Sequence, residues 1–195
     1  MAAQARIGPN AVLQHLPVLD ALIGENLRAA LLHRAGLDAP PPDAGMLHEE
    51  EVARLHHAVR LFLPAQAAAI QRAAGLATAR YILANRIPRA AQAIIRALPA
   101  PLGARVLSAA IARHAWTFAG SGRFRVHGHA PLCFEIADNP LARRASPHPV
   151  CDWHAAVFEG LFAELVWRDA TVTETLCCAA GAPSCRFMIA PHGRK

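Results

Sequence analysis

The hydrophobic periodicity of this chain changes after Trp116, and that change limits the fold to one built in two different ways. Up to Trp116, apolar residues recur at helical spacing, as they do along one side of a helix. Beyond it they alternate with polar or small residues, as in half-buried strands. The alternating residues are Phe124, Val126, Leu132, Phe134 and Ile136. We therefore predict an α+β fold in a single domain, residues 1–195, with a mainly helical part at 1–116 and a sheet-containing part at 117–195.

Prolines and glycines divide the helical part into segments. Pro9 opens the first helix, and Pro17 predicts a kink or break within its apolar pattern. Gly36 ends the second helix, and turn-favouring residues predict a loop at 38–45. The helices predicted after the first cover residues 25–34, 48–63, 64–86, 89–98 and 102–115.

The second part combines four strands with one helix. Two strands precede a loop at 138–149, and the helix at 151–167 is apolar over a wide face. Strands at 171–178 and 185–190 flank a Gly-Ala-Pro-Ser turn. The order is β-β-α-β-β, which predicts one helix laid on a small antiparallel sheet.

The composition is too apolar for a disordered chain, with 54% hydrophobic and 17% charged residues. The mean hydropathy of +0.22 is high, yet no run of apolar residues is long enough to span a membrane. A lipophilic pocket or a dimer interface would absorb the excess apolar surface. We expect the pocket between the helical layer and the β-β-α-β-β unit, lined partly by residues 75–86 and 106–118.

The net charge of +6 comes from arginine, because Lys195 is the only lysine. An anionic ligand, partner or lipid leaflet would suit it, with at most peripheral membrane contact. The arginines are scattered and lack interleaved aromatic residues, so we expect no nucleic-acid partner. The start of the chain resembles no signal peptide, which predicts a cytoplasmic protein. In that compartment the five cysteines are expected to be metal ligands or buried thiols, not disulfides.

The strongest chemical signal is the run from Glu174 to Phe187, in which Cys177 and Cys185 flank a turn. A hairpin of this kind brings both sulfurs to one place, and Cys151, at the start of the apolar helix, can supply a third. With Glu174 as an oxygen ligand, the set suits tetrahedral Zn²⁺. Buried thiols that bind no metal would show the same spacing.

The pairing of Glu174 with Cys177 has a geometric requirement. In an unbroken strand these two residues point to opposite faces, so a β-bulge is needed to bring both to one metal. Without that bulge, Cys178 would replace Cys177 as the ligand.

The run from Glu174 to Phe187, preceded by Phe158-Glu-Gly-Leu-Phe-Ala-Glu164, resembles the hallmark of the 4-vinyl reductase domain family. The stretch from Ala74 to Pro88 further resembles the bacteriochlorophyll 4-vinyl reductase (J protein) family, and the resemblance begins near residue 8. It implies a mixed α/β fold, frequent dimerisation as a homodimer, and a structural zinc. The zinc ligands it implies are Cys151, Glu174, Cys177 and Cys185.

The resemblance also implies a tetrapyrrole ligand of porphyrin or protochlorophyllide type. Enzymes of bacteriochlorophyll synthesis, such as magnesium chelatase, would then be the partners. Vinyl reduction needs a hydride donor, and no Gly-x-Gly-x-x-Gly motif or P-loop occurs in this sequence. A cysteine-closed zinc is structural, because a catalytic zinc keeps a position open for water.

We therefore expect a carrier that delivers tetrapyrrole intermediates. One alternative is the 4-vinyl (8-vinyl) reductase of divinyl protochlorophyllide, and a second is a sensor of small aromatic molecules. Flat aromatic rings and an axial imidazole would suit the ligand, although such residues more often pack in cores. The candidate ligand-binding residues are Tyr81, His114, Trp116, Phe118 and Trp153, with His154 as a second candidate imidazole.

Overall fold

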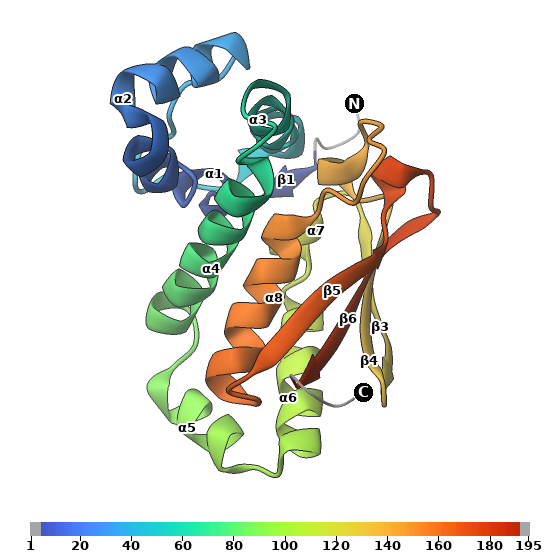
Figure 1. Ribbon diagram of the computed structural model, residues 1–195. Coiled ribbons are helices and arrows are strands. Elements are labelled where there is room, and N and C mark those ends of the chain that lie inside the picture. Colours follow the sequence, from blue (N-terminus) through green and yellow to red (C-terminus); the bar gives the residue numbers. More distant parts are fainter. Residues whose placement is uncertain (1–4, 192–195) are drawn as a thin grey trace.

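Helix α8 (Asp152–Leu165) lies between the helical layer and the sheet (Figure 1). The computed structural model describes residues 5–191. Helix α4 (Ala67–Asn85) runs along one side of α8, and a four-stranded sheet covers another side. This arrangement explains why α8 is apolar on a wide face, since a helix packed on two sides buries most of its surface.

The four-stranded sheet is antiparallel, with the order β3-β4-β6-β5. Its strands are β3 (Arg123–His129), β4 (Leu132–Ala137), β5 (Ala170–Leu176) and β6 (Ser184–Pro191). Directly opposed residues share a face of a sheet, and the pair Phe134–Phe187 is fully buried on the face toward α8. The predicted α+β class and β-β-α-β-β order are confirmed.

The helical part is divided where its prolines and glycines predict. Its helices are α1 (Asn10–Leu13), α2 (Leu16–Arg34), α3 (Glu49–Phe62), α5 (Arg89–Ala97), α6 (Ala100–Arg113) and α7 (Trp116–Ala119). The chain breaks between α1 and α2, with Pro17 in the first turn of α2, and Gly24 interrupts α2 with φ +79°. No helix within residues 5–191 combines the length and apolarity that a bilayer crossing requires.

Two details of the prediction are wrong. Helix α4 begins at Ala67, three residues after Pro64, because residues 64–66 form a turn. Strand β5 ends at Leu176, and the next turn is a 3₁₀ helix, η2 (Cys178–Ala180). Another 3₁₀ helix, η1 (Pro140–Ala142), interrupts the loop after β4.

A second, two-stranded sheet was not expected from the sequence. It pairs β1 (Arg6–Ile7) with β2 (Leu47–His48) and ties the start of the described chain to α3. Strands this short contain no repeat of alternating residues, so periodicity cannot reveal them.

The contact between α4 and α8 is too close to leave a pocket along it. A Cβ atom added to Gly75 would lie 2.5 Å from the carbonyl oxygen of Trp153, and one added to Gly160 would lie 2.7 Å from the Cβ of Ala79. The pocket expected at this seam is therefore not found along the α4–α8 contact, because glycine and alanine let the backbones approach and fill it.

A hollow of about 350 Å³ lies where α4, α5 and the end of α8 meet. It includes part of the expected 75–86 lining and none of residues 106–118. Its lining residues are Arg80, Leu83, Ala84, Arg89, Gln92 and Glu164.

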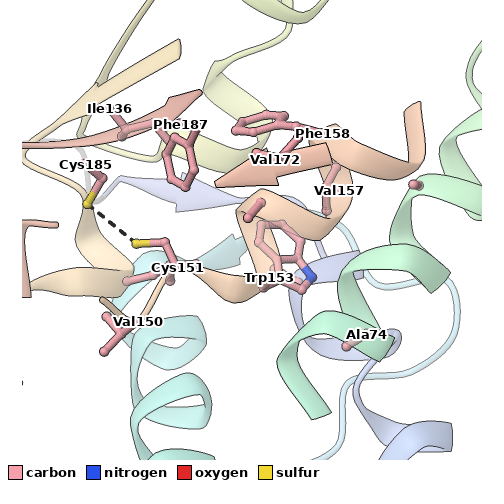
Figure 2. Packing of buried hydrophobic residues seen from close by; sticks show 14 of the residues in the cluster. Ala74, Ile136, Val150, Cys151, Trp153, Val157, Phe158, Val172, Cys185 and Phe187 are labelled. Atoms are coloured by element: carbon pink, nitrogen blue, oxygen red, sulfur yellow. Dashed lines mark hydrogen bonds between the residues drawn. The ribbon is translucent and has the colours of Figure 1, made fainter. Parts of the chain in front are cut away.

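Three buried histidines join the N-terminal helices to α8. His15 contacts Gln71 through Nε2 at 2.9 Å, and its ring meets that of His56. His56 contacts the Trp153 ring, which in turn meets His154 (Trp153 is labelled in Figure 2). Burial lowers the pKa of His15 and of His154 to about 4, so these rings are neutral in the folded protein at pH 7.

The substitution Gly75→Ala should destabilise the protein by about 1–3 kcal/mol, because the new methyl group would overlap backbone atoms that cannot move without separating α4 from α8. Urea unfolding measures this difference. Gly45→Ala is the control, since a Cβ there meets no atom within 4 Å. Equal stabilities of the two variants would contradict the close packing.

The buried histidines should make stability depend on pH. Their folded pKa values lie below the ordinary 6.5, so the unfolded chain binds more protons in acid. Their contribution is complete above pH 6.5 and is lost as the pH falls toward 4, by up to about 3 kcal/mol for each histidine. Denaturant unfolding across this range should show a shallower pH dependence for His15→Gln than for the wild type. His114→Gln, at an exposed histidine, should leave it unchanged.

Candidate metal centre

Four potential metal ligands converge at the N-terminal end of α8. One donor atom from each of Cys151, Glu174, Cys177 and Cys185 lies within 4.8 Å of the others. Figure 2 shows Cys151, just before α8, facing Cys185 at the start of β6, with 3.5 Å between the sulfurs. These are the four residues that the sequence proposed as ligands.

The register of the sheet places Glu174 and Cys185 on one face. Glu174 of β5 is paired with Phe187 of β6, and Cys185 lies two residues before Phe187. Residues two apart on a strand share a face, so both side chains turn toward α8.

The predicted bulge is present. The β5–β6 register shifts between Glu174 and Leu176, which changes the direction of the residues that follow. Cys177 thereby joins the cluster, and Cys178 does not. Cys178 contributes its backbone instead, because its N–H donates to the sulfur of Cys185 at 3.3 Å.

The turn between the hairpin cysteines is held by the backbone. The N–H groups of Ala180 and Ala182 both donate to the carbonyl oxygen of Cys177 at 3.1 Å. Gly181 has φ +88°, which strains any residue with a side chain. This turn fixes the position of Cys177 relative to β6.

Asn139 also supports the cluster and was not predicted. It is fully buried, and its Nδ2 donates to the sulfurs of Cys151 at 3.3 Å and Cys185 at 3.5 Å. Its Oδ1 accepts a hydrogen bond from the N–H of Leu141. The Asn139-Pro140 dipeptide predicts only a turn, so nothing in the sequence indicates the role of its side chain.

The thiols interact strongly in this buried place. Hydrogen bonds from Cys151 and Cys185 lower the pKa of Cys177. The hydrogen bond to Cys177 is the largest cause that raises the pKa of Cys151. The pocket therefore favours one thiolate shared by three sulfurs.

Arg60 adds positive charge near the thiols. Burial lowers the pKa of its guanidinium, and the nearby Cys151 and Cys177 act against that effect. It also donates to the carbonyl oxygen of Leu141 at 3.3 Å. A positive group here offsets part of the negative charge that thiolate ligands bring to a metal.

The donor set fits a zinc ion. Oε2 of Glu174 accepts a hydrogen bond from the N–H of Cys151, whereas the buried Oε1 has no hydrogen-bond partner among the described residues. Burial raises the pKa of Glu174 to about 8, so the ionised carboxylate lacks compensation. Three thiolates and one carboxylate oxygen are ligands that zinc accepts in tetrahedral geometry, and zinc would compensate them.

The residues proposed to bind a tetrapyrrole do not form one group. Trp153 is in the core, where its Nε1–H donates to Thr78 at 3.2 Å, and Phe118 packs on Phe124 and Phe158. The buried His154 contacts the carbonyl oxygen of Phe118 through Nε2. These contacts account for the three residues as parts of the core.

Tyr81, His114 and Trp116 lie apart from that core group. Tyr81 is half-buried on α4, with the Arg86 guanidinium over its ring. His114 and Trp116 are exposed at the end of α6 and the start of α7. Among the described residues, no ring contact joins any of these three to Phe118 or Trp153.

A helix on an antiparallel sheet, with a cysteine cluster at the hairpin, defines this chain as a 4-vinyl reductase domain protein. The model of that domain family matches residues 132–191. The chain is 57% identical over 190 residues to the bacteriochlorophyll synthase 23 kDa chain of Cereibacter sphaeroides, covering 97% of this chain and 92% of the relative. It is 51% identical over 192 residues to that of Rhodobacter capsulatus, covering 98% and 90%. The chain therefore belongs to the bacteriochlorophyll synthase 23 kDa chain family, which takes part in bacteriochlorophyll biosynthesis.

Solved structures share the fold at low sequence identity. An unliganded Fe(II) H-NOX protein from K. algicida has a TM-score of 0.65 at 11% identity, covering 96% of this chain and 98% of its own. A structure probing heme distortion in the H-NOX family has a TM-score of 0.57 at 13% identity, covering 97% of both chains. The phenol-responsive sensory domain of PoxR with phenol has 0.56 at 17%, covering 74% and 75%.

The four ligands should hold about one zinc ion per chain, as a closed structural site does. Cys185→Ser should lower both the zinc content and the melting temperature, because metal binding is coupled to folding. Elemental analysis of chelator-free protein and thermal unfolding measure the two effects. Cys133→Ser, at a half-buried cysteine outside the cluster, is the matched control. Metal-free wild-type protein that melts as the variant does would refute the site.

Proposed function

We propose that this protein is a tetrapyrrole-binding accessory protein of bacteriochlorophyll biosynthesis, which delivers porphyrin or protochlorophyllide intermediates to the enzymes that use them. Free tetrapyrroles are large, flat and poorly soluble in water. A protein that shields their apolar surface during transfer serves a physical need.

The observation that carries this proposal is the closed arrangement of the cysteine cluster. Cys151, Cys177 and Cys185 are each at most 2% exposed, and Glu174 completes four donors. A metal with four protein ligands has no open position for substrate, so it would be structural. Zinc would join the start of α8 to the β5–β6 hairpin and would supply no reductive chemistry.

The comparisons support a tetrapyrrole as ligand. The relatives are named for bacteriochlorophyll synthesis. The H-NOX family has a heme, which is also a tetrapyrrole, and its fold resembles that of this chain. The likeness concerns the fold alone, and it supports the proposal because a protein with this order of layers can hold a flat macrocycle.

The hollow between α4 and α5 is the place we propose for the ligand. Arg80 and Arg89 line it beside Leu83 and Ala84, and neither arginine forms an ion pair with a described residue. Guanidinium groups bind carboxylates through two parallel hydrogen bonds. A protochlorophyllide carboxylate would pair with these arginines while its ring covers the apolar residues, and the half-buried ring of Tyr81 lies on the same helix.

Adding divinyl protochlorophyllide to the purified protein should shift its visible absorbance bands without changing its vinyl groups, with or without NADPH. The double variant Arg80→Ala/Arg89→Ala should bind about tenfold more weakly, because two partly exposed ion pairs are lost. Arg168→Ala, which removes an exposed arginine elsewhere, is the control and should bind as the wild type does.

The same titration separates the alternatives. Repeated loss of the vinyl band with NADPH would establish a reductase and overturn the carrier role. Saturable binding of phenol without binding of protochlorophyllide would establish a sensor of small aromatic molecules. Equal binding by the wild type and the double variant would refute the placement in the hollow.

A further inference from the structure

The outward side of α6 and the start of α7 carry exposed apolar side chains. Leu102 is 48% exposed, Val106 46% and Trp116 59%. Such large apolar residues lose free energy in water when nothing covers them. Trp116 is far more exposed than the core residue Trp153, which is 3% exposed.

The exposed residues of α6 form one stripe. Leu102, Val106, Ala109 and Arg113 are spaced by four, three and four residues, which aligns them along one side of a helix. All four are exposed, whereas Leu107 and other residues of the opposite side are buried. The stripe therefore faces away from the rest of the protein.

The stripe is cationic as well as apolar. Arg113 lies on it and Arg105 beside it, and neither forms an ion pair with any residue in the described part of the chain. The sequence has no acidic residue between Glu51 and Glu135, a range that includes all of α5, α6 and α7. The local field around the stripe is therefore positive.

This charge distribution disfavours a second copy of the chain as the occupant. A two-fold contact through the stripe would place arginines against arginines without a carboxylate to separate them. The occupant must instead offer negative charge next to apolar material. The interface of an anionic lipid bilayer combines the two, with phosphates above acyl chains.

We propose that the α6 face, defined as Leu102, Arg105, Val106, Arg113 and Trp116, docks the protein on the surface of an anionic lipid membrane. Leucine and valine enter the boundary between headgroups and acyl chains, and the amphipathic indole of Trp116 stays at headgroup depth. Arg105 and Arg113 extend toward lipid phosphates, which their guanidinium groups bind. The helix lies along the surface and does not cross it.

This surface is separate from the place proposed for the tetrapyrrole. No residue of the α6 face lines the hollow of Arg80 and Arg89. Membrane docking can therefore fail while tetrapyrrole binding stands, and the reverse also holds.

The test is co-sedimentation of the full chain with vesicles of equal parts phosphatidylcholine and phosphatidylglycerol, compared with vesicles of phosphatidylcholine alone. The protein should sediment with the anionic vesicles, and the emission of exposed Trp116 should move to shorter wavelength. Added salt should release it, because the attraction is screened. Arg105→Glu/Arg113→Glu should lower the partition coefficient by about tenfold or more.

Val106→Glu should weaken vesicle binding in the same way, whereas Leu27→Glu should not. Leu27 is 61% exposed on α2, so it matches Val106 as an exposed apolar residue outside the face. Unchanged circular dichroism shows that each variant is folded. If the protein stays in solution with both vesicle types, the face serves a protein partner and the proposal is overturned. Equal partition into both types, or equal loss with Leu27→Glu, would overturn it as well.

Discussion

The close approach of α4 to α8 is the contact on which the rest of the structure depends. Gly75 and Gly160 allow it, because the backbone or side chain of the other helix occupies the space that a side chain at either position would need. Helix α8 is held against α4 on one side and covers the buried pair Phe134 and Phe187 of the sheet on another. The helical layer and the sheet therefore share one core, to which both contribute through α8.

The position of α8 also determines the cysteine cluster. Cys151 immediately precedes this helix, so any shift of α8 over the sheet would move its sulfur away from Cys185. Asn139 connects the same two sulfurs from the loop after β4. A zinc ion at this place would fix the start of α8 to the hairpin, at the end of the helix where fewer apolar contacts are available than in its middle.

The two proposed binding surfaces differ in their chemistry because they differ in burial. The hollow places Arg80 and Arg89 beside small apolar residues, which suits a flat ligand with a carboxylate. The α6 face is convex and exposed, and it suits an extended surface. A carrier of a poorly soluble pigment that also rests on a membrane would keep its ligand close to the phase in which such molecules collect.

The sequence by itself determined the α+β class, the β-β-α-β-β order and the four clustered residues, because periodicity, turn residues and cysteine spacing are local properties. The requirement for a bulge after Glu174 also followed from the alternation of a strand, and the register shift before Leu176 confirmed it. Only the tertiary structure decided that Asn139 and Arg60 support the cluster, since their contacts join segments far apart in the chain. It also decided that the seam of α4 and α8 is filled, because the distance between two helices depends on which small residues meet across the contact.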